Sequence, residues 1–260
     1  MLNITSQEWY ALINSFIWPL TRLLGVIAIA PPFGNNAVPV TIKLGFGVLL
    51  TMLVAPTLPA NSTDPVSLGG MLILAGQFLI GISIGFVMRL AFSAIEMAGE
   101  VTGLTMGLGF ATFFDPFSQG RTSAIAQYLV LIATLLMLSL NVHLSLIETL
   151  VLSFQSMPAD VDVLRHFDFK HLTGLGGQIF AIGMQLSLPI IAALLLTNVA
   201  LGILTRAAPQ LNLFGIGFPI TITVGFLMLG LITPYLMQPW TNLFQHSIEA
   251  IQFLLTPRGK

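Results

Sequence analysis

The residues that could carry out chemistry are a serine between two glycines and a pair of histidines. Gly81-Ile82-Ser83-Ile84-Gly85 has the letters of a hydrolase nucleophile elbow, in which the serine lies on a sharp turn between a strand and a helix. Here the letters lie inside a long apolar stretch, so we interpret them as small residues that allow close helix packing. His166 and His171 lie near Asp162 and Asp168 in a polar connection. A metal site needs a tighter arrangement, so we interpret them as surface residues.

Other signals of catalysis or cofactor binding are missing from the sequence. It has no cysteine, which excludes disulfides, thiol nucleophiles and thiolate metal sites. It contains no phosphate-binding loop, dinucleotide fingerprint or metalloprotease helix. The net charge is -1 and Lys and Arg form no cluster, which argues against binding to nucleic acid. We therefore expect a protein that is not an enzyme and that uses no cofactor or metal.

The composition indicates a membrane protein. Hydrophobic residues make up 55% of the chain and charged residues only 7%, and the mean hydropathy is +0.93. A soluble domain carries about 25% charged residues, because its surface faces water. Nine basic and ten acidic side chains cannot cover a chain of 260 residues. Lipid or partner subunits must therefore cover most of the surface.

Six apolar stretches have the length of membrane helices, since about 20 residues cross the hydrocarbon core. Turn-forming residues separate them, including a glycine-rich run at about residues 99–120, and no polar linker divides the chain. We predict a single all-α polytopic unit of about six long helices. The stretches are Leu12–Pro31, Ile42–Leu58, Leu68–Ile95, Ala124–Phe154, Leu175–Leu204 and Leu213–Met237.

Prolines and ionisable residues within these stretches are unusual for helices that face lipid only. An ionisable residue costs about 2.5–3.5 kcal/mol at the bilayer centre, and interrupted helices need neighbours that satisfy the freed backbone groups. Much of the surface is thus expected to pack against protein. The prolines are Pro19, Pro39, Pro56, Pro189, Pro219 and Pro234, and the ionisable residues are Arg22, Arg89, Glu96, Glu100, Glu148 and Arg206.

Gly99, Gly103 and Gly107 recur every four residues and so lie along one side of a helix. Such a stripe allows two helix backbones to approach closely. The alternative is that the glycines only loosen the chain before a turn. We favour the packing interpretation.

Four phenylalanines lie in the segment Met106–Phe117, which we call the phenylalanine-rich segment. Its glycines and its Asp-Pro pair argue against a continuous helix. Irregular apolar backbone at membrane depth is tolerated where protein buries it or where it lines a cavity. One interpretation is a re-entrant loop that closes a pore by excluding water, and the other is a loop buried at a subunit contact. The residues alone do not separate the two.

The segment Arg206–Asn212 joins two long apolar stretches and is typical of the tip of a helical hairpin. Arg206 could interact with the last carbonyl groups of the helix before it, where a cation is favoured. The alternative is a polar turn whose arginine lies at a membrane interface.

Several blocks of residues carry a resemblance that extends over nearly the whole chain. The most specific is Arg206-Ala207-Ala208-Pro209-Gln210-Leu211-Asn212. The others are Gly103–Phe113 followed by Asp115-Pro116, Asn198–Thr205, Phe214–Thr223, Trp18–Arg22, and Ala55-Pro56 with Pro59. In these blocks the chain resembles the FliR-like family of type III secretion export-gate proteins.

The resemblance implies a structural and gating function. Proteins of this family form a helical pore with FliP and FliQ, FlhB wraps its entrance, and FlhA is a further partner. Unfolded flagellar proteins pass through this pore. The expected location is the bacterial inner membrane, in the flagellar basal body. Helices long treated as transmembrane are implied to rise largely out of the bilayer once assembled.

The resemblance also assigns parts of the chain. Residues 1–173 correspond to a FliP-like part, and residues 174–260 to a FliQ-like hairpin. The pore plug falls on the phenylalanine-rich segment, and the cytoplasmic hairpin tip on Arg206–Asn212. The plug residues are Met106, Phe110, Phe113, Phe114 and Phe117, of which Phe110 and Phe113 are the expected stoppers, and the tip residues are Arg206, Pro209, Gln210 and Asn212.

Two other functions remain open on the residues. The homologous subunit of a virulence injectisome has the same fold and a different cargo, so neighbouring genes would separate it from a flagellar protein. A subunit of a small-solute transporter is the other alternative. Transporters commonly show paired repeats with broken helices that meet at a midplane site. The two halves of this chain show no convincing repeat.

Overall fold

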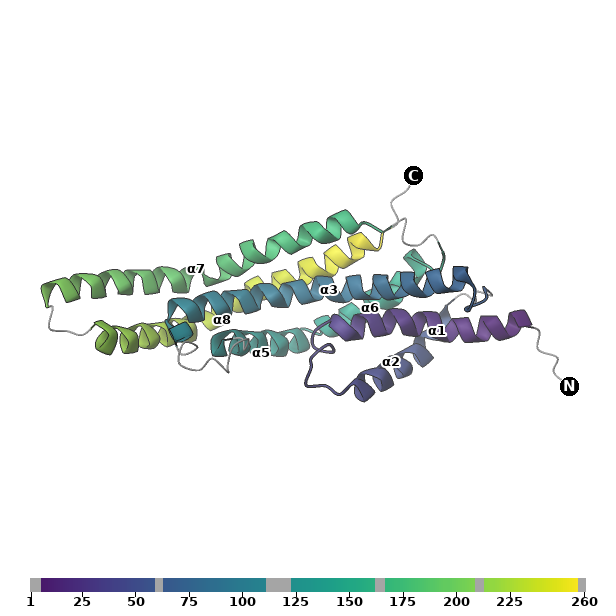
Figure 1. The fold of residues 1–260 in the computed structure, drawn as a ribbon, viewed down its shortest axis with the longest axis horizontal. Coiled ribbons are helices and arrows are strands. Elements are labelled where there is room, and N and C mark those ends of the chain that lie inside the picture. Colours follow the sequence, from purple (N-terminus) through teal and green to yellow (C-terminus); the bar gives the residue numbers. More distant parts are fainter. Residues whose placement is uncertain (1–5, 59–62, 111–122, 162–166, 209–212, 257–260) are drawn as a thin grey trace. The chain divides into compact units, whose positions relative to one another are not determined.

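The computed structural model describes residues 6–58, 63–110, 123–161, 167–208 and 213–256. All regular elements within these residues are helices, as predicted (Figure 1). They are α1 (Ser6–Ile29), α2 (Val40–Val54), η1 (Ala55–Thr57), α3 (Leu68–Thr105), η2 (Leu108–Phe110), α5 (Ala124–Ser139), α6 (Val142–Ser156), α7 (Phe169–Ala207), the π-helix η5 (Leu213–Gly217) and α8 (Phe218–Leu254).

Each predicted apolar stretch coincides with a helix or a helix pair, but several boundaries differ. Helix α7 begins at Phe169 rather than Leu175, and α8 continues past the predicted end at Met237 to Leu254. The predicted break at Gly99 is wrong, because α3 continues through Gly99 and Gly103 to Thr105. The fourth stretch is two helices, α5 and α6, bent by 66°. Asn141, between them, has a φ of 57°. That left-handed conformation, which asparagine tolerates better than most residues, turns the chain.

The helices also continue through prolines at which interruption was expected. Pro19 lies inside α1, Pro189 inside α7 and Pro234 inside α8. Each proline removes one backbone hydrogen bond, which packing against neighbouring helices can compensate.

Four described helices are long and apolar enough to cross a membrane. They are α2 with η1, α3, α7, and α8 with the end of η5, and the bent pair α5 and α6 would make a fifth. The apolar part of α1, Ile13–Ile29, is shorter. The helices support the prediction of a polytopic membrane protein, with four or five membrane-length helices rather than six.

The chain forms two compact units, and helices α3, α7 and α8 each contribute to both. Unit 1 comprises residues 1–90, 140–176 and 244–260, and unit 2 comprises residues 91–139 and 177–243. This division follows spatial contacts. The predicted division at residue 173 rests on resemblance to partner proteins and stays a prediction.

In unit 1, α1 and the first part of α3 lie side by side (Figure 1). A Cβ atom added to Gly25 would lie 2.9 Å from the Phe78 carbonyl oxygen, and one at Gly85 would lie 3.0 Å from that of Val26. At Gly81 it would collide with the Arg22 carbonyl oxygen. The glycines of the apparent hydrolase motif are thus contacts between helix backbones. The hydroxyl of Ser83 donates a hydrogen bond to the Leu79 carbonyl within α3 (2.7 Å).

In unit 2, the last part of α3 contacts α5 and α7, and the two residues after it contact α8. A Cβ atom at Gly183 of α7 would lie 3.0 Å from the Ala94 carbonyl oxygen of α3. The predicted phenylalanine-rich segment begins directly after α3, at Met106.

Candidate functional site

The structure describes only part of the predicted site. Met106 and Gly107 are described fully, and Phe110 by its backbone in η2. Arg206 lies in the last turn of α7 and is exposed, a position where a cation interacts favourably with the helix dipole. Phe113, Phe114, Phe117, Pro209, Gln210 and Asn212 lie outside the described residues.

The end of α3 is a turn that requires glycine. The Met106 N–H donates to the Thr102 carbonyl (3.0 Å), and the Gly107 N–H to the Leu104 carbonyl (3.0 Å). Gly107 has a φ of 86°. A residue in this left-handed region just past the last helical turn is the usual C-terminal helix stop, and glycine adopts it without steric cost. The phenylalanine-rich segment therefore leaves α3 by a defined turn.

Met106 and Gly107 contact one face of α8, and we call this contact the Met106 junction. Met106 is fully buried, and a Cβ atom at Gly225 would lie 2.5 Å from its Cγ, 2.6 Å from its Cε and 2.7 Å from its Sδ. A Cβ atom at Gly107 would lie 2.9 Å from the Phe218 ring. Residues three, four and seven apart lie on the same side of a helix, so Phe218, Thr221 and Gly225 form one surface.

One hydroxyl adds a polar contact to the Met106 junction. The Thr221 Oγ1 lies 3.3 Å from the Met106 carbonyl oxygen and 3.0 Å from the Phe218 carbonyl oxygen. A hydroxyl has one proton, so these two acceptors share it. The junction thus combines a flexible thioether against a glycine with a shared hydrogen bond.

The predicted glycine stripe has two partners. Gly99 faces α5, where a Cβ atom would collide with the backbone of Ala126, and a Cβ atom at Gly103 would lie 3.1 Å from the Ser123 Oγ. Gly107 contacts α8, since the turn at its positive φ redirects the chain. The close approach of α3 and α5 is the kind of contact that a small-residue stripe allows.

A hydrogen-bonded cap begins α5. The Ser123 Oγ accepts the Ala126 N–H (3.1 Å), and the Ser123 N–H donates to Glu100 Oε1 on α3 (2.6 Å). Reasoning from the sequence identified Glu100 only as a costly charge and missed Ser123, Thr221 and Gly225. A serine directly before an apolar run is a helix-start signal that could have identified Ser123.

A second polar cluster surrounds Arg22 in unit 1, and we call it the Arg22 junction. Arg22 is fully buried. Its guanidinium donates to Gln77 Oε1 on α3 (2.8 Å), to Ser153 Oγ on α6 (2.8 Å) and to the Met157 carbonyl (2.6 Å). Its Cζ lies 4.1 Å from the centre of the Phe154 ring, a cation–π distance. One arginine therefore joins α1, α3 and the end of α6.

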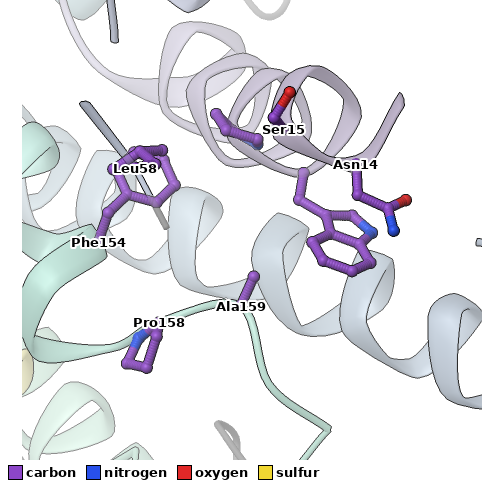
Figure 2. A pocket seen from close by; sticks show the side chains of 8 residues that line it. Asn14, Ser15, Leu58, Phe154, Pro158 and Ala159 are labelled. Carbon is purple, nitrogen blue, oxygen red and sulfur yellow. The ribbon is translucent and has the colours of Figure 1, made fainter. Parts of the chain in front are cut away.

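A small cavity lies between α1, the residue after η1 and the end of α6 (Figure 2). Its volume is about 30 Å³, enough for roughly two water molecules. The indole N–H of the buried Trp18 has no acceptor within the described residues. Its lining residues are Asn14, Ser15, Trp18, Pro19, Leu58, Phe154, Pro158 and Ala159. None of them is acidic, basic or a histidine, so the cavity offers no group for acid–base catalysis.

The part of the chain that the structure describes contains no group of three or more His, Asp or Glu residues able to hold a metal ion. The junctions are instead contacts that hold helices and the start of the phenylalanine-rich segment in position.

Comparison with known proteins gives consistent matches over most of the chain. A family model described as "Bacterial export proteins, family 1" matches residues 13–247. The chain is 43% identical to the flagellar biosynthetic protein FliR of Pectobacterium carotovorum subsp. carotovorum, over 98% of each chain. It is 42% identical to FliR of Escherichia coli K12, over 98% of each chain, and 29% identical to FliR of Bacillus subtilis 168, over 95% of this chain and 97% of that one.

Proposed function

Because the chain belongs to family 1 of the bacterial export proteins and is a component of the flagellar export apparatus, we propose that it is a structural and gating subunit of the export gate. In this proposal it forms a pore with FliP and FliQ in the inner membrane of the flagellar basal body, with FlhB and FlhA as further partners. Unfolded flagellar proteins pass through the pore. The flagellar names of the relatives favour this cargo over that of an injectisome.

The observation that carries the gating proposal is the Met106 junction. A pore wide enough for an unfolded chain must be closed at rest, and apolar side chains close a pore by making a water column unfavourable. An apolar closure works only if its ends are held in place. Met106 and Gly107 supply such a fixed end, because α8 contacts both where the phenylalanine-rich segment begins.

The exposed faces of α7 and α8 support the proposal of partner subunits. The several apolar helices give the protein a membrane location. Yet α7 has 39 residues and α8 has 37, nearly twice the number that crosses a bilayer. Lipid cannot cover such lengths, so partner helices are expected to cover the remainder. Their exposed large apolar residues include Phe180, Leu196, Ile203, Leu227 and Tyr235.

The experiment removes the expected stoppers and measures leakage. In the double variant Phe110→Gly/Phe113→Gly we expect raised small-solute leakage in cells and raised conductance of the reconstituted complex. Co-purification of FliP and FliQ should be unchanged, because the helices on either side keep their contacts. The matched control is Phe86→Gly, which removes an exposed aromatic ring from α3. If leakage of the double variant is not raised but FliP and FliQ no longer co-purify, the two phenylalanines are packing residues and the plug is refuted.

A further inference from the structure

The start of α5 has an unusual cap. Ser123 is its N-cap residue, since its carbonyl accepts the Gln127 N–H (3.0 Å) and its Oγ accepts the Ala126 N–H (3.1 Å). The Ser123 N–H donates to a carboxylate of another helix, Glu100 Oε1 of α3, at 2.6 Å. In the usual capping box this carboxylate lies on the capped helix itself, at its third residue.

The packing of α3 on α5 explains why the carboxylate comes from α3. The third residue of α5 is Ala126, which is fully buried. A Cβ atom at Gly99 would collide with the Ala126 backbone and would lie 3.0 Å from its Cβ. A glutamate at position 126 would have no room against α3. Glu100 directly follows Gly99, so the residue next to the closest approach supplies the missing acceptor.

The hydrogen bond has the properties of a strong positioning contact. A carboxylate that accepts a backbone N–H forms a charge-assisted bond, and a negative charge at a helix N-terminus is favoured by the helix dipole. An ionisable residue in a long apolar helix is otherwise unfavourable. Gly99, Gly103 and Ser123 also pack together here, and the Ser123 hydroxyl lies 3.4 Å from the Gly99 carbonyl oxygen.

We propose that Glu100 is a positioning residue of the closed gate, which fixes the start of α5 through its hydrogen bond to the Ser123 N–H. This inference rests on the proposed function. The Met106 junction fixes where the chain leaves α3, and Glu100 fixes where the chain enters α5. Both contacts lie within unit 2, so the connection between α3 and α5 is held at its two ends by the same group of helices.

The test compares three substitutions of Glu100 in the assembled complex. Glu100→Gln keeps the length and an acceptor oxygen but loses the charge. Glu100→Asp keeps the charge but is one methylene too short to reach the Ser123 N–H. Glu100→Ala loses both. Resting leakage should rise about tenfold in the Ala and Asp variants, the factor for one lost hydrogen bond to a charged group. It should rise less in the Gln variant, which keeps the hydrogen bond but loses its charge.

Each other outcome overturns the inference. A tight Asp variant with a leaky Gln variant would mean that charge alone matters. An Ala variant with wild-type leakage would mean that the cap of α5 has no effect on closure of the gate. Loss of the complex in the Ala and Asp variants would make Glu100 an assembly residue. The matched control is Glu148→Ala, which removes an exposed carboxylate from α6 in unit 1 and should leave leakage unchanged.

The Phe110→Gly/Phe113→Gly variant separates the inference from the function on which it rests. If that variant leaks and Glu100→Ala does not, the inference alone fails. If that variant stays tight, the plug fails and the inference fails with it. If both leak, Glu100→Ala added to the double variant should raise leakage no further, because the positioned closure is already gone.

Discussion

The Arg22 junction and the Met106 junction hold helices together by opposite means. At the first, a rigid guanidinium makes three hydrogen bonds of 2.6–2.8 Å and lies over an aromatic ring. At the second, a flexible thioether lies against Gly225, and one hydroxyl proton is shared between two carbonyl groups. A change at the first leaves several buried acceptors without donors, which is costly. A change at the second can be absorbed by rotation of a side chain.

A rigid, fully hydrogen-bonded contact suits permanent structure, and a flexible one suits a segment that moves. The Arg22 junction joins three segments separated by up to 135 residues along the chain. The Met106 junction holds the start of the segment that the proposed function requires to move. A contact made by a flexible side chain can hold the start of that segment and still accommodate movement of the rest, whereas a network like that of Arg22 would resist it.

The largest expected effect is at the Arg22 junction. Arg22→Ala leaves Gln77, Ser153 and the Met157 carbonyl without their donor, and we expect the unfolding free energy to fall by about 3–5 kcal/mol. Chemical unfolding of the purified complex measures this loss. Arg22→Lys is the control, because it keeps the charge but not the planar guanidinium. Its unfolding free energy should lie between those of the wild type and Arg22→Ala. A loss below about 1 kcal/mol for Ala would remove the contrast between the junctions.

The next largest effect is expected at Gly81, where the neighbour is backbone. Gly81→Ala places a methyl group against the Arg22 carbonyl oxygen, so α1 or α3 must shift. We expect a loss of about 1–3 kcal/mol, as for overpacked cores. Gly45→Ala on α2 is the matched control, because a Cβ atom there has nothing within 4 Å. In the same unfolding measurement Gly45→Ala should be neutral or slightly stabilising, because alanine favours the helix more than glycine does. Equal losses at the two positions would show that the collision with the Arg22 carbonyl oxygen is not the cause.

The smallest stability effect is expected at Gly225, although a Cβ atom added there also comes too close to its neighbour. Gly225→Ala meets the Met106 side chain at Cγ, Cε and Sδ, so this flexible side chain must adopt another rotamer, and we expect a loss of about 1 kcal/mol, smaller than that of Gly81→Ala. Leakage should nevertheless rise, because Met106 no longer lies in its place. Gly230→Ala, in the same helix with nothing within 4 Å of the new Cβ, controls for both measurements. A loss as large as that of Gly81→Ala would make the Met106 junction as rigid as the Arg22 junction.

The sequence predicted the apolar helices well because length and hydrophobicity are local properties. It did not predict the bend before α6, since Asn141 stands in an apolar run without glycine or proline. It placed a break at Gly99 because glycine disfavours helices in isolation, whereas close contact with α5 keeps α3 intact.

Only the part of the site that is contiguous in sequence was predictable. The glycine stripe and the phenylalanine-rich segment are contiguous, so their residue types were visible together. Thr221 lies 115 residues beyond Met106 along the chain, and the partners of Arg22 are 55 to 135 residues away from it. No periodicity links positions so far apart. The sequence therefore identified Arg22 and Glu100 as charges in need of partners without naming the partners.

The length of α7 and α8 has a consequence for the life of a newly made chain. Lipid can cover only part of helices of 39 and 37 residues with apolar exposed faces, so the remainder stays uncovered until partner subunits bind. In a cell, unassembled copies are then substrates for the proteases that remove incomplete membrane proteins. The amount of this protein should follow the synthesis of its partners rather than that of its own message. The amount of this subunit would thus be set after translation, by degradation of the copies that find no partners.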